Sequence, residues 1–151
     1  MPRLSRKVMA NRTSKLGGFS AAVVGLALLA GSATFAQAQT LDSSSLTLNN
    51  EQVAAGRKVV GQSCSECHGV TLRGALGPAL RDEGFTGNWG GRPLSALHEF
   101  TTAAMPPAGP GTLSDEEYLA IMAYILSNNG FEKADDGVAI TAENLGEIVF
   151  K

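Results

Sequence analysis

The five residues from Cys64 to His68, with the sequence Cys-Ser-Glu-Cys-His, constrain the fold of this chain more than any other stretch. Two thiols separated by two residues and followed directly by an imidazole form the attachment pattern for a covalent c-type haem. Cys64 and Cys67 would add across the two vinyl groups of the haem, and His68 would give the iron one axial nitrogen. Such a chain also needs export, a second iron ligand and an apolar enclosure.

Three other roles are open to these cysteines, which are the only two in the chain. In an oxidising compartment Cys64 and Cys67 could form a disulfide. A thioredoxin-like redox pair requires strands that alternate with helices around the motif, whereas the flanking sequence is helical or rich in glycine. A structural zinc site needs four ligands, and the chain adds only His68 and the distant His98 to the two thiols. Haem attachment is therefore the preferred interpretation.

The first 38 residues have the features of a secretory signal peptide. Residues 1–15 contain five basic side chains and no acidic one, and a moderately apolar run follows from Phe19 to Ala36. Small residues favour cleavage after Ala38, with a cut after Ala36 as the alternative. An uncleaved anchor is disfavoured because glycine and hydroxyl residues dilute the run, and a span needs about 20 strongly apolar residues. We therefore expect a periplasmic protein without a permanent membrane span.

The segment that remains after cleavage is acidic. Removal of residues 1–38 leaves 113 residues, enough for one domain. It also removes five of the twelve basic residues and none of the fourteen acidic ones, so that the formal charge moves from −2 to −7. A nucleic-acid partner is disfavoured because phosphate recognition requires a basic surface. A protein partner with a basic docking surface fits this charge better.

Residues 39–50 are rich in Ser, Thr and Asn, and we expect them to form a flexible lead-in. A helix is expected from Glu51 to about Ser63, because the asparagines before it can cap its first turn. Val53, Gly56 and Val60 recur at helical spacing and form its packing face. This helix leads directly into the cysteine motif.

The segment from Gly69 to Gly91 contains seven glycines and is expected to be a long loop. A loop of this length is uncommon in a compact domain unless it is functional. We expect it to wrap around a flat cofactor. Its apolar anchors are Leu72, Leu76, Leu80, Phe85 and Trp89.

Two further helices and a tail complete the expected domain. Pro93 fits the first turn of a helix that runs to about Thr102. Ser114, followed three residues later by Glu117, forms a capping box at the start of the last helix. We expect residues 132–151 to pack back on the domain, with one short helix near residues 142–148. The apolar stripe of the last helix comprises Tyr118, Ile121, Met122 and Ile125, and Gly130 marks its end.

Met105 is predicted to be the second axial ligand. Pro106 and Pro107 end helical structure and hold this residue in an extended loop, which a packing methionine does not need. Met122 lies instead on the apolar stripe of the last helix, as a core residue does. His98 falls inside a helical segment and is interpreted as an exposed histidine. A thioether raises the potential relative to a second imidazole, which suits an electron carrier.

The order of these features resembles that of class I c-type cytochromes. More narrowly, it is similar to the small cytochromes that accept electrons from periplasmic quinoprotein dehydrogenases. The likeness covers residues 51–131. The residues that carry it are Gly56, residues 64–69, Gly77-Pro78-Ala79-Leu80, residues 85–89, Met105-Pro106-Pro107, residues 113–118 and residues 123–130.

The resemblance implies an all-α cytochrome c fold, with three to four helices around one covalently attached haem. It implies that the first and last helices cross where Gly56 gives Ile121 and Tyr124 room to approach. One departure from the family is Val60, which stands where an aromatic residue is frequent. This departure concerns the detail of the crossing rather than the fold.

The resemblance also implies roles for residues around the haem. The carbonyl of Pro78 would accept a hydrogen bond from the ring N–H of His68 and fix the orientation of that ligand. Trp89 and Arg92 are the candidate partners of the haem propionates. With Cys64, Cys67 and Met105, these residues make up the expected cofactor site.

We therefore expect an electron carrier without catalytic residues, in which the iron cycles between Fe(III) and Fe(II). Its expected redox partners are a periplasmic dehydrogenase and a terminal oxidase or second cytochrome. One alternative is a haem enzyme of the peroxidase or sulfur oxidoreductase type, in which Met105 is displaceable. The other is a permanent cytochrome subunit of a dehydrogenase complex.

Overall fold

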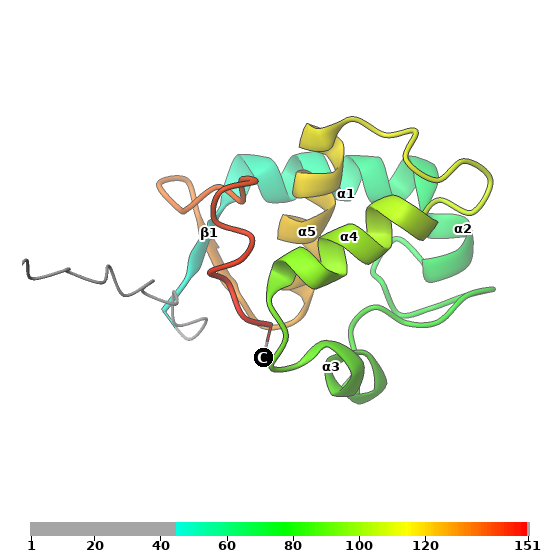
Figure 1. Ribbon diagram of the computed structural model, residues 1–151, viewed down its shortest axis with the longest axis horizontal. Coiled ribbons are helices and arrows are strands. Elements are labelled where there is room, and N and C mark those ends of the chain that lie inside the picture. Colours follow the sequence, from blue (N-terminus) through cyan, green and yellow to red (C-terminus); the bar gives the residue numbers. More distant parts are fainter. Residues whose placement is uncertain (1–44, 151) are drawn as a thin grey trace, which may run out of the picture. The chain divides into compact units, whose positions relative to one another are not determined.

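Two long helices, α1 (Asn50–Ser63) and α5 (Asp115–Asn128), cross at the centre of the domain (Figure 1). The computed structural model describes residues 45–150, so the predicted signal peptide and its cleavage sites lie outside the described residues. Gly56 lies at the crossing, where a Cβ atom would overlap the backbone carbonyl of Ala120 and press on Cβ of Tyr124. The predicted crossing is confirmed, with Ala120 making the closest approach where we expected Ile121.

Both crossing helices begin with the caps expected from the sequence. The side chain of Asn49 accepts a hydrogen bond from the backbone N–H of Gln52 at 2.9 Å. Ser114 and Glu117 form the reciprocal capping box of α5. Each cap satisfies amides that the first helical turn leaves without an intrahelical partner. Helix α5 is buried continuously from Ala120 to Leu126, so it forms the spine of the core.

The end of the predicted lead-in belongs to the fold. Thr47–Asn49 form strand β1, which pairs in parallel with strand β2 (Glu132–Ala134). Leu48 is fully buried, and residues 47–49 are therefore ordered rather than part of the flexible segment expected over 39–50. Backbone pairing between residues more than 80 positions apart leaves no local signal in the sequence, which explains the error.

The predicted glycine-rich loop over residues 69–91 contains a helix that the sequence did not indicate. After the short helix α2 (Ser65–His68), the chain turns through irregular structure and enters α3 (Glu83–Trp89). The side chain of Asp82 caps α3 by accepting from the N–H of Phe85 at 2.7 Å. Gly84 and Gly87 lie inside this helix, and glycine is unfavourable there, so the composition concealed it.

Helix α4 (Leu94–Ala104) is capped by the C-terminal tail. Pro93, expected inside the helix, takes its N-cap position and has no side-chain acceptor to offer. The carbonyls of Ile148 and Leu145 accept instead from the N–H groups of Leu94, at 2.7 Å, and Ser95, at 3.1 Å. The tail therefore lies against the start of α4 (Figure 1).

The short helix expected near residues 142–148 is absent from the tail, which forms turns over that stretch. The side chain of Asn144 accepts from the N–H of Thr141 and donates to the carbonyl of Ala139. These bonds, with the two carbonyls that cap α4, compete with a helical ladder. Ile140, Ile148 and Phe150 of the tail are nonetheless almost fully buried.

The all-α prediction is confirmed. The described residues hold five helices, where we expected three to four, and one small parallel sheet of two strands. Among the described residues, none of the helices is long and apolar enough to cross a membrane.

Candidate functional site

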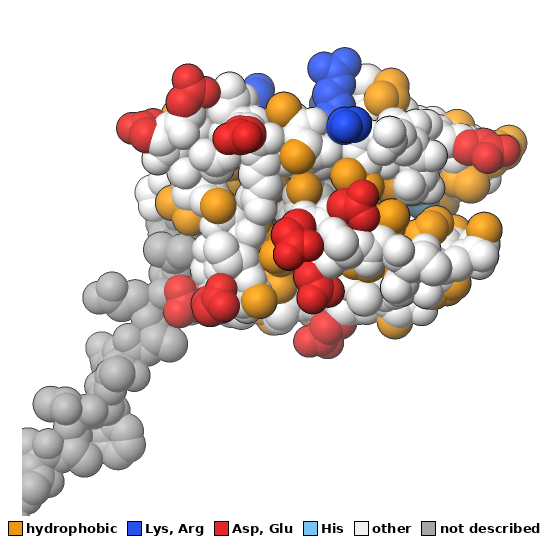
Figure 2. All heavy atoms as spheres, turned by 90° about the horizontal axis from the view of Figure 1, so that it is seen from above, with side chains coloured by type: hydrophobic (Ala, Val, Ile, Leu, Met, Phe, Trp, Pro, Cys, Tyr) orange, Lys and Arg blue, Asp and Glu red, His pale blue; other side chains and the backbone are white. Residues whose placement is uncertain are grey.

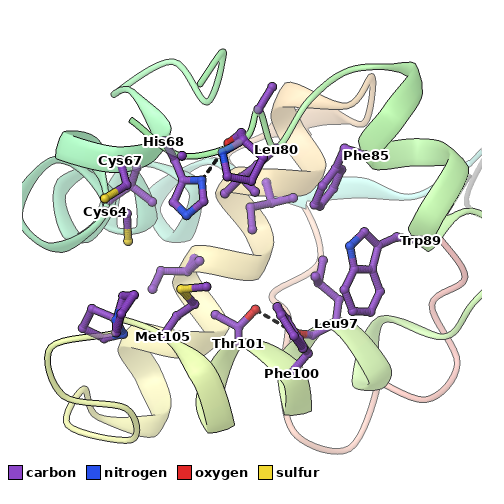
Figure 3. Close-up of a pocket in the computed structure, with 18 of the residues that line it drawn as sticks. Cys64, Cys67, His68, Leu80, Phe85, Trp89, Leu97, Phe100, Thr101 and Met105 are labelled. Carbon is purple, nitrogen blue, oxygen red and sulfur yellow. Dashed lines mark hydrogen bonds between the residues drawn. The ribbon is translucent and has the colours of Figure 1, made fainter. Parts of the chain in front are cut away.

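A cavity of about 930 Å³ opens between the cysteine motif, α3, α4 and the loop that precedes α5. Its volume falls within the roughly 300–1,000 Å³ of small-molecule and cofactor sites. The walls are mostly apolar and come from segments spread over 65 positions of the chain, between Val60 and Ile125. Residues drawn in Figure 3 that line it include Cys64, Cys67, His68, Leu80, Phe85, Trp89, Leu97, Phe100, Thr101 and Met105.

His68 occupies one side of this cavity with a fixed orientation. Its Nδ1 lies 2.7 Å from the carbonyl oxygen of Pro78. Because a carbonyl can only accept, Nδ1 carries the proton and Nε2 is left with its lone pair. The ring projects into the cavity, so this lone pair is available to a metal centre (Figure 3).

The two cysteines lie beside His68 at the cavity wall. Cys64 is the C-cap of α1, and Cys67 lies on α2, one turn later. Both thiols are half-buried and free, so the structure contains no disulfide between them. Burial, and secondly the neighbouring Cys67, raise the pKa of the Cys64 thiol above its ordinary value. Cys64 is therefore held in the protonated thiol form at neutral pH.

Met105 lies across the cavity from His68 (Figure 3). It is the C-cap of α4, and its backbone N–H donates to the carbonyl of Thr101 at 2.8 Å. The chain then runs through Pro106 and Pro107, which also line the cavity. The structure therefore places an imidazole and a thioether on opposing walls.

Tyr118 is a residue of this region whose role sequence reasoning missed. Its hydroxyl donates to the carbonyl of Met105 at 2.8 Å and accepts from the N–H of Gly111 at 3.0 Å. The side chain is 1% exposed. The sequence showed only that Tyr118 belongs to the apolar stripe of α5. A signal was available, because a buried tyrosine hydroxyl needs a hydrogen-bond partner.

Trp89 and Arg92, the candidate propionate partners, both line the cavity. The Arg92 guanidinium lies 4.5 Å from the centre of the Trp89 ring, at cation–π distance. The ring of Phe100 also packs against Trp89, with the two ring centroids 5.5 Å apart. An arginine thus lies at the cavity over the ring of Trp89.

The structure agrees with one of three further interpretations made from the sequence and disagrees with the other two. Met122 is fully buried and absent from the cavity wall, in agreement with its interpretation as a core residue. His98 was expected to be exposed, but it is half-buried, packs edge-on against Tyr118 and does not line the cavity. Leu76 was expected to be an apolar anchor of the loop, but it is 82% exposed.

These donors suit a haem iron. Imidazole nitrogen and thioether sulfur are an axial pair found in cytochromes, and two thiols beside the imidazole match covalent attachment. The apolar wall restricts solvent access, which influences the redox potential of a metal centre. The residues present therefore fit a haem of the c type.

The comparisons with known proteins agree with this chemistry. The sequence pattern of the family described as cytochrome c oxidase, cbb3-type, subunit III matches residues 51–125. The fold resembles the crystal structure of the sulfane dehydrogenase SoxCD from Paracoccus pantotrophus, with a TM-score of 0.51 and 27% sequence identity. That match covers 65% of this chain and 52% of that chain. No match was found among the curated proteins.

The chain belongs to the c-type cytochromes. The cytochrome domain carries haem c with iron and serves haem-based electron transfer. The match spans about half of the solved chain, so the activity of that dehydrogenase is not assigned to this chain.

Proposed function

We propose that this cytochrome is a periplasmic one-electron carrier with a single haem bound covalently through Cys64 and Cys67. In this proposal His68 and Met105 are the axial ligands. The observation that carries it is the placement of imidazole and thioether on opposing walls of one apolar cavity, with both thiols beside the imidazole.

The chain's own residues prepare each bond. Cys64 and Cys67 would hold the haem by thioether bonds, since each S–H would add across one vinyl double bond to form one C–S and one C–H bond with no leaving group. The Pro78 carbonyl accepts from Nδ1–H of His68, which leaves the lone pair on Nε2 and holds the ring in place. When bound, the haem supplies one-electron exchange between Fe(III) and Fe(II).

The remaining wall residues stabilise the site rather than react. Phe85 and Leu97 are nearly fully buried and supply apolar surface. The guanidinium of Arg92, held over Trp89, is positioned to neutralise a propionate at the cavity. If His68 and Met105 both hold the iron, no coordination position would be left for a substrate. This favours a carrier over a peroxidase or sulfur oxidoreductase.

Matched methionine variants test this assignment. We expect the haem-loaded wild type to be low-spin, with the far-red band of methionine ligation in its ferric spectrum. Met105→Leu is expected to lose that band, whereas Met122→Leu, a similar change of volume in the core, is expected to keep it. A high-spin wild type that binds peroxide readily, or a band that survives in Met105→Leu, would contradict the carrier assignment.

The partner is proposed from charge and from the structural likeness. The segment after residue 38 has a formal charge of −7. On the face in Figure 2, hydrophobic side chains surround a hollow and acidic side chains are widely spread, whereas the basic ones gather near one edge. These features support docking to a basic surface on a dehydrogenase, with onward transfer to a terminal oxidase or second cytochrome.

A second candidate is a permanent subunit of a dehydrogenase complex, favoured by the likeness to SoxCD. Copurification from a periplasmic extract separates the two. A dehydrogenase that remains stoichiometric through gel filtration at high salt supports a subunit, because a transient electrostatic complex dissociates under those conditions. Elution as a free monomer supports the carrier.

A further inference from the structure

The segment that presents Met105 forms few hydrogen bonds within itself. The Met105 loop, residues 105–113, connects α4 to α5 and contains Pro106, Pro107 and Pro110. Proline has no backbone N–H, so these positions cannot donate to a turn or a ladder. Within the loop, Gly109 donates to the carbonyl of Pro106 at 2.9 Å. Thr112 Oγ1 donates to the carbonyl of Gly109 at 2.7 Å.

One side chain of α5 joins the two ends of this loop. The Tyr118 hydroxyl donates to the Met105 carbonyl and accepts from Gly111 N–H, so both capacities of the phenol group are directed at the loop. The ring itself is fixed by burial and by the edge of His98, whose ring centre lies 6.2 Å away. A rigid helix thus holds the backbone of Met105 in place from behind the cavity.

We propose that Tyr118 is a positioning residue that sets how firmly Met105 holds the iron. The proposal rests on the proposed function, since it takes Met105 as an axial ligand. Tyr118 does not line the cavity, so it acts through the Met105 backbone rather than on the haem. With the hydroxyl in place, departure of the thioether from iron requires either a side-chain rotation or the breaking of two hydrogen bonds. Without it, the carbonyl of Met105 loses its contact with α5, and the Met105 backbone keeps only its N–H bond to Thr101.

The chain offers a matched control in Tyr124. This residue lies on the same helix, is 7% exposed, and donates its hydroxyl to the carbonyl of Val70 at 2.8 Å. Tyr124→Phe therefore removes a similar buried hydrogen bond from a different loop. Any effect of lost stability alone is expected in both variants, whereas an effect on Met105 ligation is expected in Tyr118→Phe only.

The experiment is a titration of ferric, haem-loaded wild type, Tyr118→Phe and Tyr124→Phe with imidazole, followed by loss of the far-red methionine band. Imidazole competes with the thioether, so its apparent affinity reports how readily Met105 leaves. Tyr118→Phe is expected to bind imidazole about two- to tenfold more tightly, the range that corresponds to about one net hydrogen bond. Tyr124→Phe is expected to match the wild type.

A second measurement keeps the result independent of folding. Urea unfolding of the same three proteins shows whether the two tyrosine variants lose comparable stability. Equal imidazole affinities in all three proteins, or an equal increase in both variants, would overturn the positioning role while leaving Met105 as a ligand. Absence of the methionine band from the wild type would overturn both this inference and the proposed ligand pair. Only the selective effect of Tyr118→Phe supports the inference.

Discussion

The two walls of the cavity are held by different means. On the His68 side, backbone amides hold the wall in place. The N–H of Gly74 donates to the carbonyl of His68 at 2.9 Å, and the N–H of Gly77 donates to the carbonyl of Cys67 at 2.7 Å. On the Met105 side, prolines limit the backbone and Tyr118 supplies the connection to the core. Covalent attachment would fix the first wall further. The comparison indicates a histidine wall held by backbone hydrogen bonds and a methionine wall that one tyrosine side chain connects to the core.

The largest expected effect breaks the support of the histidine wall. Gly56→Ala places a Cβ atom on the backbone carbonyl of Ala120, so α1 and α5 must separate. We expect a loss of about 3 kcal/mol or more in the free energy of unfolding, the upper range for overpacking. Urea unfolding of the haem-loaded protein measures it.

Gly61→Ala is the control for that change. A Cβ atom at Gly61, in the same helix, meets no neighbour within 4 Å. Alanine is the better helix former by about 0.5–1 kcal/mol, so this variant is expected to gain stability. If both variants lost stability equally, the loss in Gly56→Ala could not be assigned to the helix crossing.

The next prediction compares the two cavity walls in the wild-type protein by amide hydrogen exchange. Amide hydrogen exchange is expected to be slower at Gly74 and Gly77 than at Gly109 and Gly111, because local opening needs fewer bonds to break in the Met105 loop. The expected difference, corrected for intrinsic rates, is at least about tenfold, equivalent to about 1.4 kcal/mol of opening free energy. Comparable protection at the four glycines would remove the distinction between the walls.

A smaller effect is expected at the start of α5, next to the Met105 loop. Ser114→Ala removes the acceptor for the N–H of Glu117, which lies 3.2 Å away. The loss of an N-cap costs about 1 kcal/mol of stability. Thermal or urea unfolding measures it, and Ser114→Thr, which keeps a hydroxyl acceptor, is the control expected to stay close to the wild type. A Ser114→Ala variant as stable as the wild type would show that the capping box does not stabilise α5.

The smallest effect is a dependence on pH at the same place. The backbone N–H of Glu116, and secondly the Ser114 hydroxyl, hold the pKa of the fully exposed Glu116 carboxyl below its ordinary value of 4.5. A lowered folded pKa means that this stabilisation is complete above the ordinary pKa and is lost as the pH falls through the lowered one. Glu116→Gln is expected to reduce the change of the unfolding midpoint with pH between about pH 5 and pH 3. An identical pH profile in both proteins would exclude the contribution of Glu116.

Local sequence signals predicted the elements that local physics decides. The asparagine cap and the capping box determine where α1 and α5 begin, and Gly56 identified the face on which they cross. They failed for α3, where two glycines outweighed the cap at Asp82. They failed again for the tail, where its carbonyls cap α4 instead of continuing a helix.

The site residues that lie in short sequence motifs could be predicted. The spacing of Cys64, Cys67 and His68, and the prolines after Met105, predicted a shared site, and all four residues line the cavity. The hydrogen bond from His68 to Pro78 came with the family resemblance and is present at 2.7 Å. Tyr118 could not be assigned in this way, because its partners are a carbonyl and an amide seven or more residues away.

The sequence by itself determined which side chains could serve as donors to a haem, because thiol, imidazole and thioether chemistry belongs to the side chains wherever they lie. Only the tertiary structure decided that His68 and Met105 face one another across an apolar cavity, since that depends on the crossing of α1 with α5. It also decided the pairing of β1 with β2 and the connection from Tyr118 to the Met105 loop. These contacts join distant segments, and their free energy comes from burial and hydrogen bonds that form only when the whole domain folds.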